Sequence, residues 1–132
     1  MRSMQKAIVT MGPVDFGMTG VVRNHKVIID EPIENGGQDT GPAATEYLCL
    51  ALASCTTATI KMYANRKQWK IDSLSVEVEK NTIDGKNVFS RTLRIKGMLD
   101  GDQLTRLKQI ADACPVHKIL MHANSVETVL GN

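Results

Sequence analysis

The feature that most constrains the fold is a long stretch without charge in the middle of the chain. No residue between Glu46 and Lys61 is charged. We predict one helix from about Pro42 to about Lys67, with the proline in its first turn. A helix that is apolar all round is buried on more than one side. We therefore expect a central helix covered by a sheet and by other helices or a second subunit. Its clearest inward stripe consists of Leu48, Ala51, Leu52, Cys55, Ala58, Thr59 and Met62.

Strand patterns flank this helix on both sides. Before it we predict a strand at Met4–Thr10 and a hairpin formed by Phe16–Arg23 and Lys26–Asp30. After it, residues 73–81 and 88–98 alternate around an Asp84-Gly85 turn, with Leu93 and Ile95 facing inward. Two helices follow, separated by Pro115, and a last strand is predicted at Ser125–Leu130. Strands and helices in separate runs indicate an α+β fold, and the length of 132 residues suits one domain, 1–132.

Composition excludes several classes of function. The net charge is only +2 and Trp69 is the single tryptophan, so nothing indicates a nucleic-acid surface. The uncharged run Tyr47–Ile60 is too short to cross a bilayer, and the first residues lack the apolar segment of a signal peptide. We expect no membrane association. Three cysteines are an odd number, which argues against a secreted disulfide framework and favours the reducing cytoplasm.

Two cysteines lie where their helices should face the interior. Cys55 belongs to the central helix, and Cys114 ends the apolar face of a later one. If the two helices meet, the thiols can form a redox pair. Because an apolar environment raises a thiol pKa, Cys55 needs a cation nearby to ionise. Arg23 in the N-terminal hairpin is the leading candidate, and Glu46 can orient it through a bidentate pair.

Simpler interpretations of the same residues stay open at this point. A cysteine on an apolar stripe often only packs, and Cys49 is interpreted in that way. Arg23 can be a solvated charge at a strand end, and Glu46 an acid favoured by the helix dipole. A zinc site at Cys114, His117 and His122 lacks a second paired motif. We therefore expect no metal and no cofactor.

Three motifs resemble one known family. They are Gly36-Gly37-Gln-Asp-Thr-Gly41-Pro42, the segment from Glu46 to Thr56 around Cys55, and Cys114-Pro115-Val116-His117-Lys118. With these motifs the chain resembles the OsmC/Ohr family, the osmotically inducible and organic hydroperoxide resistance proteins, over nearly its whole length. The resemblance implies an OsmC-like fold with antiparallel sheets around a long buried central helix, in an intertwined homodimer.

The resemblance also implies a function. Cys55 matches the peroxidatic cysteine and Cys114 the resolving cysteine of a thiol-dependent peroxidase that reduces organic hydroperoxides. In the family, an Arg near the N-terminal strands and a Glu near the start of the central helix assist the thiolate. Arg23 and Glu46 lie at these two places in this sequence. The reductant is a dithiol, such as a lipoylated protein. The alternative is a non-catalytic protein that binds an apolar or thiol ligand at the dimer interface.

Overall fold

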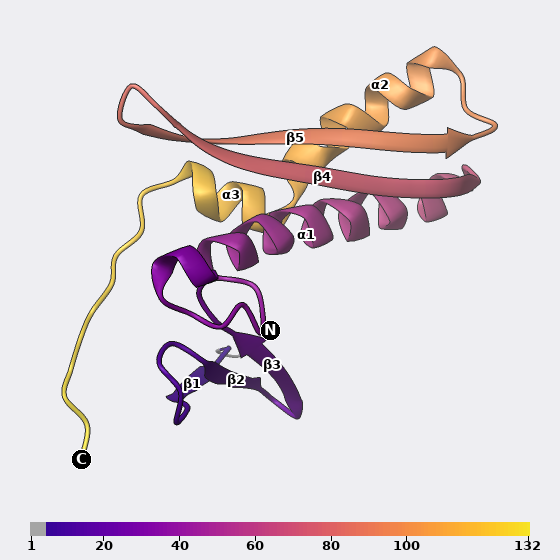
Figure 1. Ribbon diagram of the computed structural model, residues 1–132. Coiled ribbons are helices and arrows are strands. Elements are labelled where there is room, and N and C mark those ends of the chain that lie inside the picture. Colours follow the sequence, from indigo (N-terminus) through magenta and orange to yellow (C-terminus); the bar gives the residue numbers. More distant parts are fainter. Residues whose placement is uncertain (1–4) are drawn as a thin grey trace. The chain divides into compact units, whose positions relative to one another are not determined.

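The structure is a computed structural model that describes residues 5–132 (Figure 1). It divides into two compact units, an N-terminal unit up to Leu48 and a C-terminal unit from Cys49 onward. Helix α1, Ala44–Lys67, starts in the first unit and contributes most of its length to the second. The structure is mixed α+β with antiparallel sheets, as predicted.

The N-terminal unit contains a three-stranded antiparallel meander in the order β1-β2-β3. The strands are β1 Ala7–Met11, β2 Met18–Val22 and β3 His25–Ile29. The predicted hairpin is present, with its turn at Arg23 and Asn24 between the paired Val22 and His25. The first predicted strand is shifted toward the C-terminus, and its residue Met4 lies outside the described residues.

A loop held by one buried carboxylate connects β3 to α1 and contains a short 3-10 helix, η1 Ile33–Asn35. Asp30 is 1% exposed and accepts hydrogen bonds from the Thr40 hydroxyl at 2.6 Å and from three backbone amides. The helix then begins at Ala44, and the Glu46 carboxylate accepts from the Ala43 amide at 2.7 Å. The prediction that Pro42 lies in the first turn is therefore wrong. Its carbonyl is used by the loop, where it accepts from the Asp30 amide.

The C-terminal unit is built on a long hairpin that runs along α1 (Figure 1). Its strands are β4 Ile71–Ile83 and β5 Lys86–Gly97, joined by the predicted turn at Asp84-Gly85, where both residues have positive φ. Three helical segments follow: α2 Gly101–Ile110, the 3-10 turn η2 Ala111–Ala113, and α3 Pro115–Met121. Asp100 and Gln103 form a capping box at the start of α2.

The core of the C-terminal unit joins α1, α2 and η2 through Ile60, Leu107 and Ala111, and half-buried residues of the hairpin pack against it. The buried stripe of α1 is Leu52, Thr56, Ile60 and Ala64, with four-residue spacing. Of the predicted stripe only Leu52 is fully buried, and Met62 is 63% exposed. One stripe of the helix is thus buried within the single chain, and further apolar side chains stay uncovered.

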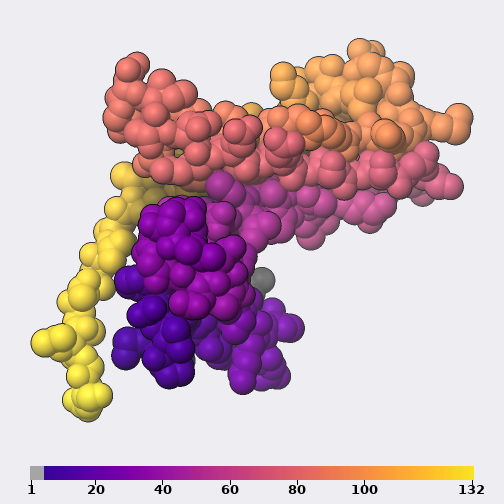
Figure 2. Space-filling view, viewed as in Figure 1, coloured from indigo at the N-terminus to yellow at the C-terminus, as the bar shows by residue number. Residues whose placement is uncertain are grey.

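The predicted last strand is wrong for the single chain. Residues 123–132 form no helix or strand, and Val126, Val129 and Leu130 are almost fully exposed. In Figure 2 this segment is the extended yellow string of residues. A strand needs a neighbouring strand to pair its backbone groups, and none lies beside Ser125–Leu130 in the described chain. Of the described helices, none has the length and apolar content that crossing a membrane would require.

Candidate active site

The structure brings Cys55 and Cys114 together within the C-terminal unit. Cys55 lies on α1, and Cys114 lies between η2 and α3. Both thiols are free, and they lie close enough for each to shift the pKa of the other. The contact exists because η2 packs Ala111 into the same core as Ile60 of α1, which carries the following turn onto the helix.

Cys114 is fully buried, yet its surroundings favour the thiolate. Burial alone would raise its pKa, but hydrogen bonds from the Cys55 thiol, the His117 amide, the Thr56 hydroxyl and the Val116 amide outweigh it. The pKa of Cys114 is therefore below its usual value. The sulfur also caps α3, where it accepts from the His117 amide at 3.4 Å. Pro115, the first residue of this helix, has no amide hydrogen of its own, so it adds no unpaired donor at that end.

Cys55 has the opposite tendency. Burial raises the pKa of its thiol, and the hydrogen bond it donates to Cys114 raises it further. The Val116 amide and the Thr59 hydroxyl lower it, but do not compensate. Cys55 is half-buried, whereas Cys114 is not exposed at all. The pair thus consists of an accessible thiol and a hidden one that ionises more readily.

A charged cluster adjoins the two thiols, and the sequence patterns had not indicated it. The Arg91 guanidinium donates to the Thr56 hydroxyl at 3.0 Å and to the Asp112 carboxylate at 2.7 Å, and lies 3.3 Å from Nδ1 of His117. The signal that could have revealed it is the alternation of β5. Two residues before the inward Leu93 is Arg91, so a cation had to lie on an apolar face.

Arg23 and Glu46 belong to the N-terminal unit, so each is described there alone. Arg23 occupies the β2–β3 turn with φ of 54°. Glu46 has the local role of a residue at a helix start, because it accepts from the Ala43 amide. Their roles at Cys55 stay predictions. Cys49, to which no role was given, is a half-buried free thiol.

Among residues 5–132, no group of three or more His, Cys, Asp or Glu side chains is arranged to hold a metal ion. His117 belongs to the Arg91 cluster, and the backbone of His122 ends α3. The zinc site at Cys114, His117 and His122 is therefore not formed by the described residues.

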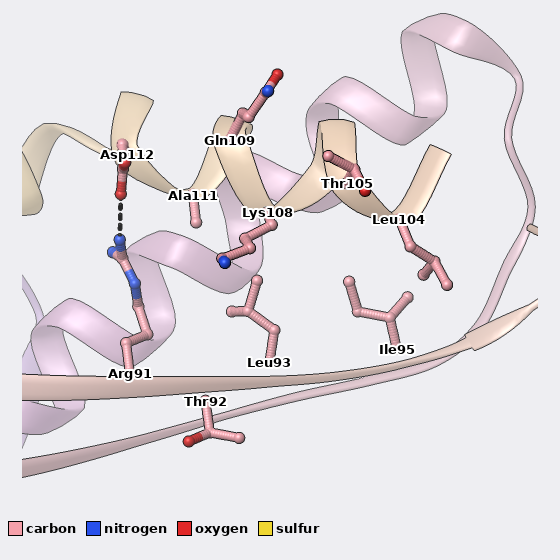
Figure 3. Close-up of a pocket in the computed structure, with 10 residues that line it drawn as sticks. All are labelled: Arg91, Thr92, Leu93, Ile95, Leu104, Thr105, Lys108, Gln109, Ala111 and Asp112. Atoms are coloured by element: carbon pink, nitrogen blue, oxygen red, sulfur yellow. Dashed lines mark hydrogen bonds and ion pairs between the residues drawn. The ribbon is translucent and has the colours of Figure 1, made fainter. Parts of the chain in front are cut away.

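A cavity of about 780 Å³ lies between β5 and α2, beside the Arg91 cluster (Figure 3). Leu93 and Ile95 point into it from the strand and Leu104 from the helix, while the Arg91–Asp112 ion pair closes one end. Cavities of this volume with mostly apolar walls and a few polar groups are typical of small-molecule sites. This one can take an apolar chain beside a charged end.

Two thiols in contact, one from a long helix and one from the turn between two short ones, define an α+β protein with a candidate redox centre. The family model described as "OsmC-like protein" matches residues 36–129. The chain therefore belongs to the OsmC-like family, as the three motifs predicted. A search of the curated proteins found no match.

Solved structures share the fold at low sequence identity. An osmotic stress induced and detoxification response protein from Psychrobacter arcticus 273-4 is 24% identical, with 90% of each chain covered and a TM-score of 0.76. An OsmC like protein from Mycoplasma pneumoniae is 20% identical, with 92% of this chain and 89% of that chain covered and a TM-score of 0.76. The organic hydroperoxide resistance protein OsmC from Legionella pneumophila is 18% identical, with 89% of each chain covered and a TM-score of 0.67.

Proposed function

We propose that this protein is a thiol-dependent peroxidase that reduces organic hydroperoxides, with Cys55 as the peroxidatic and Cys114 as the resolving cysteine. The observation that carries the proposal is the closeness of these two free thiols in a chain of the OsmC-like family. Cys55 takes the first role because a hydroperoxide must reach the sulfur, and Cys114 is fully buried. The lowered pKa of Cys114 suits the second role, since a thiolate is the nucleophile.

The reaction then has three steps. The Cys55 thiolate attacks the distal oxygen of the hydroperoxide, so that an S–O bond forms, the O–O bond breaks and the alkoxide leaves as an alcohol after taking a proton. The Cys114 thiolate attacks the resulting sulfenic acid, which forms the disulfide and releases hydroxide as water. A dithiol, for which a lipoylated protein is our candidate, reduces the disulfide by exchange.

Cys55 needs help to ionise, because burial and its bond to Cys114 both raise its pKa. No cation is among the groups that shift this pKa most. We assign the help to Arg23, positioned by Glu46, as the family resemblance implies. We also propose that residues 1–132 act as a single OsmC-like domain in an intertwined homodimer. Exposed apolar residues of α1 such as Met62 are consistent with a second copy that covers them.

The compartment and the substrate follow from the same site. Three free thiols of which two must cycle between reduced and oxidised states suit the reducing cytoplasm. We propose alkyl hydroperoxides rather than hydrogen peroxide as substrates, because Cys55 lies on a helix whose neighbouring side chains, such as Leu52 and Met62, are apolar. The alternative is a non-catalytic binding protein, and the raised pKa of Cys55 is the observation in its favour.

Consumption of cumene hydroperoxide in the presence of dihydrolipoamide tests the proposal. Cys55→Ser should abolish turnover, and Cys114→Ser should allow only one round of oxidation per chain. Cys49→Ser is the matched control, since it removes a half-buried thiol of the same helix and should leave turnover unchanged. A wild-type protein that binds the hydroperoxide without consuming it would support the binding-protein alternative. Turnover by Cys55→Ser at the wild-type rate would refute the role of Cys55.

A further inference from the structure

Arg91 occupies a position on β5 where the strand pattern favours an apolar side chain. It shares the inward face with Leu93 and Ile95, and its side chain is only 12% exposed. Arg94, on the outward face, is 59% exposed and forms an ordinary surface pair with Glu77. A guanidinium stays charged, and removing that charge from water is costly. Its only carboxylate partner among the described residues, Asp112, is itself 68% exposed. Stability alone is therefore a weak reason for Arg91.

The first contact of Arg91 fixes a hydroxyl beside Cys114. Thr56 is fully buried, and its oxygen accepts from Arg91 while its proton has two acceptors, the Leu52 carbonyl at 2.7 Å and the Cys114 sulfur. Because Arg91 can only donate, it occupies a lone pair of the hydroxyl oxygen and keeps the proton directed toward those acceptors. The hydroxyl is thus held ready to donate to a thiolate.

The second contact holds the residue on the other side of Cys114. His117 donates its backbone amide to the Cys114 sulfur, and its ring nitrogen Nδ1 lies 3.3 Å from the guanidinium. Because a guanidinium can only donate, Nδ1 is the acceptor in this contact. One guanidinium therefore contacts two of the residues that hydrogen-bond to Cys114, Thr56 on α1 and His117 on α3.

We propose that Arg91 is the positioning residue of the resolving thiol, because it holds Thr56 and His117 around Cys114 so that this sulfur faces Cys55. The inference rests on the proposed function, since it concerns the second step of the reaction. In that step the Cys114 thiolate forms the S–S bond, and the S–O bond of the sulfenic acid breaks. Arg91 touches neither sulfur in this step, but fixes the groups that do.

Single-turnover oxidation measures the formation of the Cys55 sulfenic acid and the formation of the disulfide as two separate rates, and the proposal concerns only the second. Arg91→Gln should form the Cys55 sulfenic acid at a rate close to that of the wild type, measured by dimedone trapping in a Cys114→Ser background. Disulfide formation should slow by about tenfold or more, the effect of losing one hydrogen bond to a charged group. Arg94→Gln is the matched control, because it removes a cation from the same strand, and both rates should stay unchanged.

Titration of the thiolate tests the same role without any hydroperoxide. With Cys49 and Cys55 replaced by serine, the absorbance at 240 nm reports Cys114 alone. In this variant three elements place titratable or charged groups around the thiol: β5 supplies Arg91, η2 supplies Asp112 and α3 supplies His117. In the wild type, α1 adds Cys55. Arg91→Gln should raise the titration midpoint, and Arg94→Gln should not move it.

Arg91→Lys keeps the positive charge and is the second variant for both measurements if Arg91→Gln does not fold. One ammonium cannot reproduce the fork of a guanidinium. Disulfide formation should therefore still be slowed and the midpoint still raised. A wild-type midpoint together with a wild-type rate of disulfide formation in either folded variant would overturn the role of Arg91. If wild-type protein consumes no hydroperoxide but the midpoint moves as expected, the peroxidase function fails while the positioning of Cys114 by Arg91 stands.

Discussion

The contact between Arg91 and Thr56 makes a quantitative prediction for stability. Thr56→Val keeps the shape of a fully buried side chain but removes the oxygen that Arg91 donates to at 3.0 Å. A hydrogen bond to a charged group contributes about 1.5–3 kcal/mol. Because Arg91 keeps some access to water at 12% exposure, we expect a loss of about 2 kcal/mol, within the lower part of that range.

The matched control is Thr57→Val on the same helix. Both hydroxyls donate to the carbonyl four residues earlier, at 2.7 Å for Thr56 and 2.8 Å for Thr57, but only Thr56 receives an arginine. Threonine and valine have similar helix propensities, so the difference between the two variants isolates the arginine contact. Urea unfolding at one fixed protein concentration measures it. Equal shifts of the midpoint in both variants would refute the contribution of the Arg91–Thr56 bond.

Two further predictions concern the N-terminal unit. The Thr40 hydroxyl lowers the pKa of Asp30 most, burial opposes it, and three backbone amides lower it further. A carboxylate whose pKa is lower in the folded state stabilises that state at pH values above its unfolded pKa of about 3.9. This stabilisation is lost as the pH falls through the folded pKa. Asp30→Asn should thus unfold at lower urea than wild type at pH 7, and the gap should narrow below about pH 4; a constant gap would contradict this. Gly37→Ala would place a Cβ in collision with the Glu31 carbonyl oxygen, whereas a Cβ at Gly101 meets nothing within 4 Å. Thermal unfolding should show a lower midpoint for Gly37→Ala alone, and equal midpoints for the two variants would contradict the close approach.

Local patterns were sufficient for most of the secondary structure. Alternation with a turn at Asp84-Gly85 predicted the β4–β5 hairpin, and the uncharged stretch after Glu46 predicted α1. The start of α1 was misplaced because the loop uses Pro42 and Thr40 for contacts with Asp30, which is distant in the pattern. The last strand was wrong because strand formation depends on a partner, which propensity does not supply.

The site was only partly predictable, for a related reason. Spacing placed Cys55 and Cys114 on inward faces, but only the packing of Ile60 against Ala111 shows that the two helical segments meet. Arg91 lies two residues before Leu93, the first of the two apolar residues from which the inward face of β5 was inferred. Its partners Thr56 and His117 lie on other elements, so no local pattern links them. The differing pKa values of the two thiols also depend on groups brought together by folding.

The most direct test of the Cys55–Cys114 pair is intact-mass spectrometry after one equivalent of cumene hydroperoxide, with free thiols then alkylated and the product mapped. We predict loss of two protons and of two alkylation sites, with a disulfide between Cys55 and Cys114 and an unmodified Cys49 thiol that alkylates as before. Three cysteines that all remain alkylatable after treatment would contradict the redox pair and favour a binding protein built on the same fold.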